Sequence, residues 1–187
     1  MEVNNKNIVL IGFMGTGKTS VGRLISSKMN MNFIDIDEEI KSRISMSIGD
    51  IFLKHGEAFF RSIESEVVKE ICNKKNCVIS TGGGVVLNYS NIENLSCNGV
   101  IIQLKGSGST ILRNVTQELS KSEDRPLLQS DNLFKRIVQL MEEREPYYAK
   151  CSEYEVCIDN MSQQQVVDYI LKTLSLKQMF GFLNLLL

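Results

Sequence analysis

The sequence predicts a three-layer α/β/α fold around a central five-stranded parallel sheet. Five short apolar runs have the character of buried strands, and segments with helical periodicity lie between them. Strands that alternate with helices pair in parallel, so helices should cover both faces of the sheet. Glycine-rich or acidic residues follow the first three runs. We therefore expect a ligand site beyond the carboxyl ends of those strands.

The elements alternate regularly along the chain, and no internal repeat is evident. The strands are expected at residues 8–11, 32–34, 77–80, 99–104 and 154–158. The helices are expected at residues 21–28, 38–43, 48–53, 57–72, 88–95, from 109, 131–145 and from 163. Gly56 should separate two of these helices, and Pro146 should limit the one that Asp131 caps. The polar stretch 114–130 lacks periodicity, which predicts a mobile loop or lid.

Composition favours one globular domain with a small-molecule partner. The chain has 187 residues, of which 43% are hydrophobic and 23% charged, with a net charge of -1. This balance offers no basic excess for nucleic acid, and no apolar run reaches the length of a membrane span. We expect a single cytoplasmic domain at residues 1–175, its lid at about 114–130, and an apolar tail at 176–187 that packs on the domain. A monomer is expected, with a weak dimer through the tail as the alternative.

The cysteines and the single histidine do not predict a metal site. The five cysteines include no C-x-x-C pair, and His55 is the only histidine. Free thiols in a reducing compartment are the expected state. His55 is expected at the surface, without a catalytic role.

The stretch Gly12–Thr19 fits the phosphate-binding pattern G-x-x-x-x-G-K-[ST]. It follows the first predicted strand and precedes a helical pattern, which is the context that this loop requires. Glycines allow backbone N–H groups to turn toward a phosphate chain, and the helix adds the positive end of its dipole. Lys18 should contact the outer phosphates, and the Thr19 hydroxyl should bind Mg²⁺. The chain is therefore expected to bind a nucleoside triphosphate.

Asp35 and Asp37 follow the second predicted strand. Their spacing sends both side chains to the same face of an extended chain. One carboxylate could hold Mg²⁺, and the other could accept a proton from an attacking hydroxyl. The alternative is that Asp37 only caps the helix that begins at Glu38.

Two arginines are candidates to bind an anionic group of a substrate. Arg61 lies near the start of one predicted helix and Arg144 near the end of another. Their planar guanidinium groups suit a carboxylate or a phosphate. On residue type alone the surface alternative is favoured, with Arg144 paired to Glu143 or Glu145.

Three consecutive glycines, Gly82–Gly84, follow the third predicted strand. Because ordering glycine carries a large entropy cost, an ordered triplet indicates a close approach of a ligand to the backbone. Arg125 lies in the predicted lid directly before Pro126, which favours an extended backbone there. A cation that arrives with a closing lid could neutralise charge on the transferring phosphoryl group, although a solvated loop charge is the alternative.

The motifs together resemble the shikimate kinases, small-molecule members of the P-loop kinases. The matching pieces are Gly12–Thr19, F-x-D-x-D at 33–37, G-E-x-x-F-R at 56–61, S-T-G-G-G at 80–84, R-P-L-L at 125–128 and R-x-x-x-Y at 144–148. They occur in the family's order and cover roughly residues 7–173. The resemblance implies transfer of the ATP γ-phosphoryl group to the 3-hydroxyl of shikimate, in the route to chorismate and aromatic amino acids.

The resemblance also implies roles for particular residues. Asp37 would be the base, with Lys18 and Arg125 as its catalytic partners. Shikimate would contact Asp37, Arg61, Gly82, Gly83, Gly84 and Arg144. ATP would contact Gly12, Gly15, Thr16, Gly17, Lys18, Thr19, Ser20, Arg113 and Arg125, with Arg113 a candidate to pack on adenine. Thr19 and Asp35 would serve Mg²⁺.

Three other functions remain open at this point. A kinase for gluconate or a nucleoside monophosphate would share the phosphate loop but has less use for the glycine triplet and the two arginines. A GTPase-type switch would need [NT]-K-x-D, whereas the nearest segment, 73–76, reads N-K-K-N. A catalytically silent nucleotide-binding protein is disfavoured by the intact Lys18, Thr19, Asp35 and Asp37.

Overall fold

The five predicted strands form one parallel sheet, which confirms the expected fold class. The computed structural model describes residues 6–120 and 131–183, and the side chains of 6–117 and 134–176 among them. The strands are β1 Asn7–Ile11, β2 Asn32–Asp35, β3 Cys77–Ser80, β4 Gly99–Lys105 and β5 Tyr154–Cys157. Their order is β2-β3-β1-β4-β5, and every neighbouring pair is parallel. The first strand thus lies at the centre, and the loop after it lies at the middle of one sheet edge.

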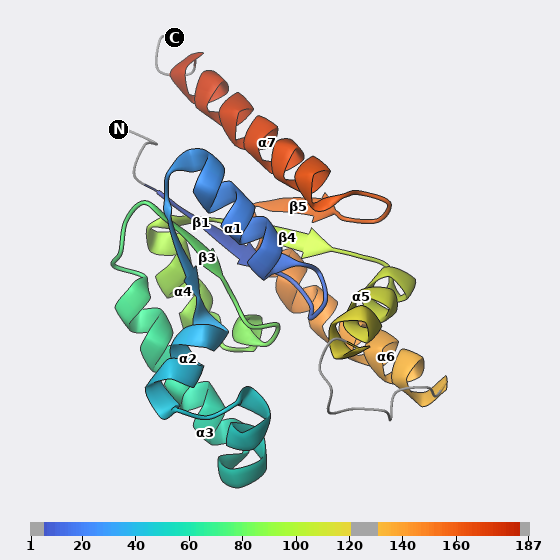
Figure 1. The fold of residues 1–187 in the computed structure, drawn as a ribbon. Helices are drawn as coiled ribbons and strands as arrows, with labels where there is room; N and C mark the ends of the chain where they lie inside the picture. The colour runs from blue at the N-terminus through green and yellow to red at the C-terminus, as the bar shows by residue number, and fades with distance from the viewer. Residues whose placement is uncertain (1–5, 121–130, 184–187) are drawn as a thin grey trace.

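Helices cover both faces of the sheet (Figure 1). They are α1 Lys18–Met29, α2 Ile36–Ile44, α3 Ile48–Ile71, α4 Tyr89–Cys97, α5 Gly108–Ser120, α6 Asp131–Cys151 and α7 Gln163–Leu183, with a 3-10 turn at Val85–Leu87. Each face of the sheet carries one hydrophobic core cluster. One cluster includes side chains of α1 and α7, and the other includes side chains of α2, α3, α4, α5 and α6. The layers therefore match the three-layer prediction.

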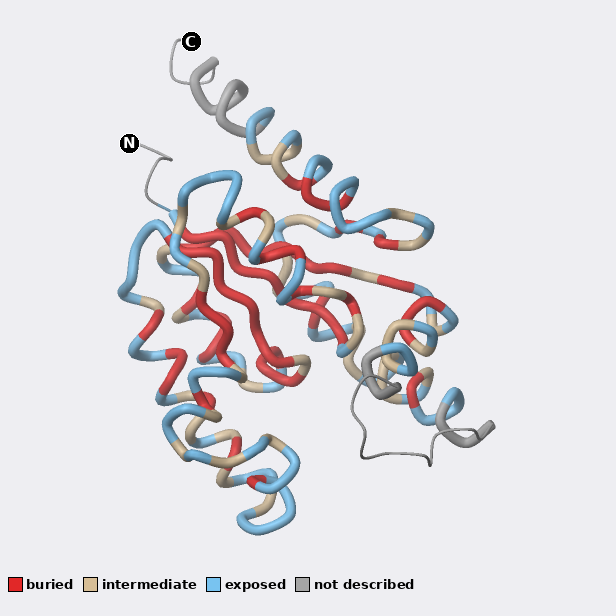
Figure 2. Tube along the Cα trace, viewed as in Figure 1, coloured by how far each residue is buried: buried red, intermediate tan, exposed pale blue. Residues whose placement is uncertain are grey.

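The alternation of side chains along β1 shows how the sheet supplies both cores. Ile8 and Leu10 belong to the cluster with α1 and α7, whereas Val9 and Ile11 belong to the opposite cluster. All four are buried, and the buried stretches in Figure 2 run through the middle of the molecule. Because both faces are covered, the strand reads as a continuous apolar run in the sequence.

The helix that follows β2 begins earlier than the sequence suggested. Asp35 is its N-cap, and one carboxylate oxygen, Oδ1, accepts hydrogen bonds from the N–H groups of Asp37 and Glu38 at 3.1 and 3.4 Å. The alternative that Asp37 caps this helix is therefore wrong. Asp37 lies in the first turn, where its side chain is left for other contacts.

Gly56 breaks the next helical segment as expected. Its φ of 82° and ψ of 170° interrupt α3, a backbone conformation that glycine adopts readily. Ser47 caps the first half by accepting a hydrogen bond from Asp50 N at 3.0 Å. His55 lies just before the break and is exposed, as predicted.

Two expectations about the second half of the chain were wrong. Residues 114–120 belong to α5 instead of a loop, because Asn114 bonds the phosphate loop and Val115 packs on the core. The part of the predicted lid at 121–130 lies outside the described residues. The helix α6 continues past Pro146 to Cys151. Proline removes one helical hydrogen bond, but the buried side chain of Tyr148 holds the following turn against the core.

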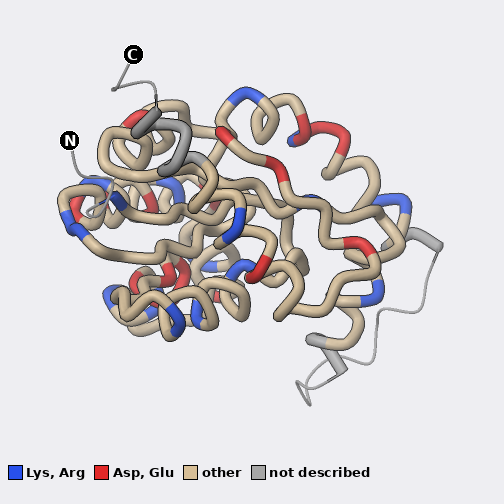
Figure 3. The backbone as a smooth tube through the Cα atoms, turned by 90° about the horizontal axis from the view of Figure 1, so that it is seen from above, with Lys and Arg blue, Asp and Glu red and all other residues tan. Residues whose placement is uncertain are grey.

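The charges, the cysteines and the C-terminal helix complete the description of the fold. Basic and acidic residues are interspersed along the chain in the view of Figure 3. All five cysteines are free. Within the described ranges, no helix is both long and apolar enough to cross a membrane. Residues 176–183 of the predicted tail continue α7, and the side chains from 177 onward lie outside the described set.

Candidate active site

The loop between β1 and α1 has the backbone of an anion cradle. Gly12, Gly15 and Gly17 have φ angles of 145°, 74° and 80°, a region that favours glycine. A Cβ atom at Gly12 would lie 2.4 Å from the Leu104 carbonyl oxygen, so no side chain fits there. Gly17 is the N-cap of α1, which aims the first turn of that helix at the cradle.

Lys18 is the buried cation of this loop. Its Nζ atom donates to the carbonyl oxygens of Gly12 and Phe13 at 2.8 and 2.9 Å. Only 8% of the residue is exposed. These contacts hold the ammonium group over the loop, within reach of an anion that the backbone N–H groups would bind.

Oxygen ligands gather beside the start of α1. The Thr19 hydroxyl donates to Asp35 Oδ2 at 2.7 Å and lies 3.4 Å from Ser80 Oγ. The three side chains come from α1, β2 and β3, whose ends meet at this edge of the sheet. Two hydroxyls and a carboxylate are the donor types that Mg²⁺ accepts, so the residues fit such an ion.

Asp37 lies among charges of both signs. Burial raises the pKa of its carboxyl group and the nearby Asp35 raises it further, whereas Lys18, Lys41 and Arg61 lower it. A Cβ atom at Gly82 would lie 2.8 Å from Asp37 Oδ1. Asp37 therefore stands beside the glycine triplet and close to the phosphate-loop lysine.

Arg61 is held in place by two acids of its own helix. It donates to Glu57 Oε1 at 3.1 Å and to Glu64 Oε2 at 2.8 Å. The Glu64 side chain is fully buried, and burial raises the pKa of its carboxyl group even though Arg61 lowers it. Its Oε1 atom has no hydrogen-bond partner among the described residues. Sequence reasoning missed Glu64, although its i+3 spacing from Arg61 was a usable signal.

Arg144 reaches the glycine triplet from α6. Its Nη1 atom donates to the Gly83 carbonyl oxygen at 3.2 Å, and its guanidinium carbon lies 5.7 Å from the centre of the Phe13 ring. The Tyr148 hydroxyl donates to the same Gly83 oxygen. Sequence reasoning quoted Tyr148 in a motif but gave it no role.

The glycine triplet lies in close contact with three other parts of the site. Cβ atoms at Gly82, Gly83 and Gly84 would lie 2.8 Å from Asp37 Oδ1, 3.3 Å from Met14 N and 2.2 Å from Arg61 Nη2. The described glycines with positive φ do not include these three. The triplet thus allows an acid, the phosphate loop and an arginine to approach one short segment.

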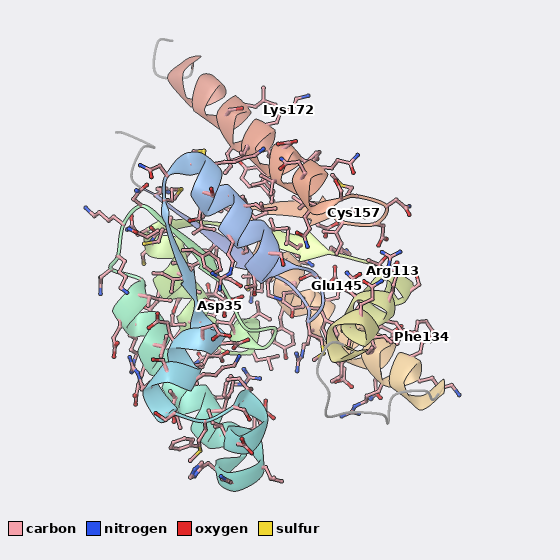
Figure 4. The ribbon with its side chains drawn as sticks, in the orientation of Figure 1. Asp35, Arg113, Phe134, Glu145, Cys157 and Lys172 are labelled. Carbon is pink, nitrogen blue, oxygen red and sulfur yellow. The ribbon has the colours of Figure 1, made fainter. Side chains whose placement is uncertain are left out.

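A cavity of about 380 Å³ opens on the other side of the phosphate loop. The residues that line it include Gly15, Thr16, Gly17, Ser20, Arg113 and Asn114. Asn114 of α5 donates to the Gly15 carbonyl oxygen at 2.8 Å, which ties the helix to the loop. Asp35 belongs to β2 and Arg113 to α5, and the two residues lie apart in Figure 4.

The structure thus brings most of the predicted site residues to one sheet edge. Burial raises the pKa of Asp37, whereas the positive charges of Lys18 and Arg61 lower it. Burial also raises the pKa of Tyr148, whereas the positive charges of Arg144 and Arg61 lower it. Arg125 lies outside the described residues. A phosphate cradle, a paired acid and two guanidinium groups on a β2-β3-β1-β4-β5 sheet define a small-molecule kinase of the P-loop class.

Comparison with known proteins identifies the family within this class. Residues 14–175 match the family model for shikimate kinase. The shikimate kinase of Caldanaerobacter subterraneus subsp. tengcongensis is 47% identical over 89% of this chain and 95% of its own length. That of Thermodesulfovibrio yellowstonii is 46% identical over 89% and 94%. The chain belongs to the shikimate kinase family and is an ATP-dependent phosphotransferase.

Solved structures agree with this assignment. Shikimate kinase from Acinetobacter baumannii in complex with shikimate matches with a TM-score of 0.79 at 32% identity, over 93% of both chains. The enzyme from Bacteroides thetaiotaomicron gives 0.81 at 31% identity, over 93% of this chain and 99% of its own. A gluconokinase from Sinorhizobium meliloti gives 0.59 at 15% identity, over 96% and 97%, a likeness of fold alone.

Proposed function

We propose that this protein transfers the γ-phosphoryl group of ATP to the 3-hydroxyl of shikimate, yielding shikimate 3-phosphate and ADP. The observation that carries the proposal is the convergence of Asp37, Arg61 and Arg144 on the glycine triplet beside the phosphate loop. The relative from Acinetobacter baumannii binds shikimate, which supports the same acceptor here. The product would feed chorismate and aromatic amino acid synthesis in the cytoplasm, with the protein acting as a monomer.

The two arginines supply the recognition of the acceptor. Shikimate carries one carboxylate, and the guanidinium groups of Arg61 and Arg144 both lie against Gly82–Gly84. Bonds between guanidinium and carboxylate are charge-assisted and directional. Backbone groups of the triplet would complete the acceptor site.

Asp37 is the proposed base. Its carboxylate would accept the proton of the attacking hydroxyl, and Lys18 lies close enough to interact with its charge. Lys18 would exchange its Gly12 and Phe13 carbonyl partners for phosphate oxygens. Arg125 is proposed to add a further cation to the nucleotide.

The nucleotide would occupy the phosphate loop and the adjoining cavity. Gly12 to Ser20 would surround the phosphates, and Arg113 at the cavity wall would pack on adenine. Thr19 and Asp35 would hold Mg²⁺, which neutralises phosphate charge when bound. The protein needs to form no covalent bond to the substrates in this scheme, because phosphoryl transfer depends mainly on positioning and on neutralisation of charge.

A coupled assay of ADP release from Mg²⁺-ATP tests the proposal. Shikimate should stimulate ADP release strongly, whereas gluconate should not. Stimulation by gluconate alone would transfer the assignment to another small-molecule kinase. Chelation of Mg²⁺ with EDTA should abolish the shikimate-dependent rate.

The same assay tests the proposed base. Asp37→Asn should lower turnover by roughly 10²- to 10⁴-fold, because the amide cannot accept the proton. Lys18→Met should also cut turnover severely through loss of phosphate neutralisation. If Asp37→Asn phosphorylates shikimate at the parental rate, the assignment of Asp37 is wrong.

A further inference from the structure

The Gly83 carbonyl oxygen receives two side-chain donors at once. Tyr148 donates its hydroxyl hydrogen to this oxygen, and Arg144 donates from Nη1 at 3.2 Å. A carbonyl oxygen has two lone pairs, so both hydrogen bonds can coexist. The two donors lie one turn apart on α6 and reach the triplet from the same side.

Only one of these donors has a second task in the proposed function. Arg144 is expected to bind the carboxylate of shikimate. A carboxylate attracts a guanidinium group more strongly than a neutral carbonyl oxygen does. Its contact with the Phe13 ring is compatible with a small reorientation toward the anion. Gly83 is half-buried, so its carbonyl would then depend mainly on its other donor, because a polar group that is partly shielded from water loses free energy when it is unpaired.

We propose that Tyr148 is a positioning residue that retains the Gly83 carbonyl when Arg144 turns to the acceptor. It thereby keeps the triplet in place against Asp37 and Arg61. This inference deepens the proposed function and rests on it. Tyr148 is suited to the task because it is 2% exposed. Burial raises the pKa of Tyr148 to about 12, so the hydroxyl remains a donor at neutral pH.

Tyr148→Phe removes the hydroxyl while keeping the ring. In the variant, the KM for shikimate should rise roughly two- to tenfold, the effect of one lost neutral hydrogen bond. The KM for ATP should stay at the parental value. Tyr147→Phe is the matched control, since Tyr147 is the neighbouring residue on α6 and is 47% exposed. Both kinetic constants of this control should match the parent.

Thermal unfolding with and without saturating shikimate separates positioning from simple packing. The free Tyr148→Phe variant should keep a near-parental Tm, because Arg144 still pairs with Gly83. The rise in Tm on adding shikimate should be smaller than in the parent, because the bound state lacks the second donor.

Each other outcome contradicts the inference. An unchanged KM for shikimate, or equal shifts of both KM values, would overturn it. A Tyr148→Phe chain that fails to fold would also overturn it, because Arg144 alone would then be unable to hold the segment. Shikimate-dependent turnover by the parental protein reports separately on the proposed function.

Discussion

At the scale of single residues, Arg61, the proposed contact of the acceptor carboxylate, is already held in place by its own helix. Glu57 and Glu64 accept hydrogen bonds from its guanidinium group, and the missing side chain of Gly84 leaves room for that group. Side-chain order that exists before binding lowers the entropy cost of binding. The arginine thus offers its remaining donors in a fixed direction.

Arg61→Ala should weaken acceptor binding more than turnover. The lost charge-assisted contact corresponds to about 1.5–3 kcal/mol, or roughly a 10- to 150-fold rise in KM for shikimate. Steady-state kinetics with each substrate varied in turn would measure it. An Arg61→Lys variant keeps the positive charge but loses the planar guanidinium group, so its KM for shikimate should lie between those of the parent and of Arg61→Ala. If only the KM for ATP rises, the assignment of Arg61 to the shikimate site is wrong.

Glu64→Gln should flatten the dependence of stability on pH. The pKa of Glu64 is raised above 4.5 in the folded protein, mainly by burial, so the folded state holds the proton more tightly than the unfolded state. The stability that this group contributes is present below pH 4.5 and is lost as the pH rises through the raised pKa. Glutamine does not titrate, so the variant should lose less stability over this range.

Urea unfolding at a series of pH values from 4.5 to neutrality would measure this slope. Glu66→Gln, on an exposed position of the same helix, controls for the removal of a negative charge. Parallel pH curves for Glu64→Gln and the parent would contradict the prediction.

The sequence predicts functional residues that belong to a recognisable motif, but it does not reveal those that act through tertiary contacts. Lys18 and Thr19 follow from one motif, because local spacing fixes their chemistry. Glu64 and Asn114 have no such pattern. Their importance depends on contacts with Arg61 and with the Gly15 carbonyl, which sequence periodicity does not report.

At the scale of elements, α5 supports the phosphate loop. Asn114 donates to the Gly15 carbonyl oxygen, and a Cβ atom at Gly15 would lie 2.8 Å from Val115 Cγ2. The helix and the loop are therefore packed directly against each other. Polar composition alone suggested a lid here, because the partners of Asn114 and Val115 in the phosphate loop lie far away in sequence.

Asn114→Ala should impair the nucleotide side of the site alone. Loss of one neutral hydrogen bond should raise the KM for ATP by roughly two- to tenfold, with the KM for shikimate unchanged. Two-substrate kinetics would show the split. The exposed Thr116→Ala on the same helix is the control. A larger effect on shikimate than on ATP would argue against this role for α5.

The elements themselves were largely predictable, and their ends were not. The strands and their parallel arrangement follow from apolar runs separated by helical patterns. Pro146 was expected to limit α6, yet packing of Tyr148 outweighs the cost of the lost hydrogen bond. Asp35, not Asp37, begins α2, because capping depends on backbone geometry that sequence leaves open.

At the scale of the whole molecule, the strand order places the phosphate loop between the two proposed substrate sites. β1 lies between β3 and β4, so the phosphate loop has the glycine triplet after β3 on one side and the cavity beside α5 on the other. The family match ends at residue 175, whereas α7 continues to Leu183. The role of the apolar tail stays a prediction.

Deletion of residues 179–187 tests whether the tail joins two copies. If the weak dimer exists, sedimentation velocity should show a concentration-dependent rise in the parental sedimentation coefficient that the truncated chain lacks. The apolar composition of the segment is the reason for this expectation. An unchanged monomer with and without the segment would remove support for the dimer.

The two oxygens of Asp35 have separate partners. Oδ1 caps the helix that carries Asp37, and Oδ2 accepts a hydrogen bond from Thr19 beside the phosphate loop. Because both oxygens belong to one carboxylate, any substitution of Asp35 acts on the helix cap and on the Thr19 contact together. A replacement of Asp35 made to alter the proposed ion site would therefore also change the N-cap of α2.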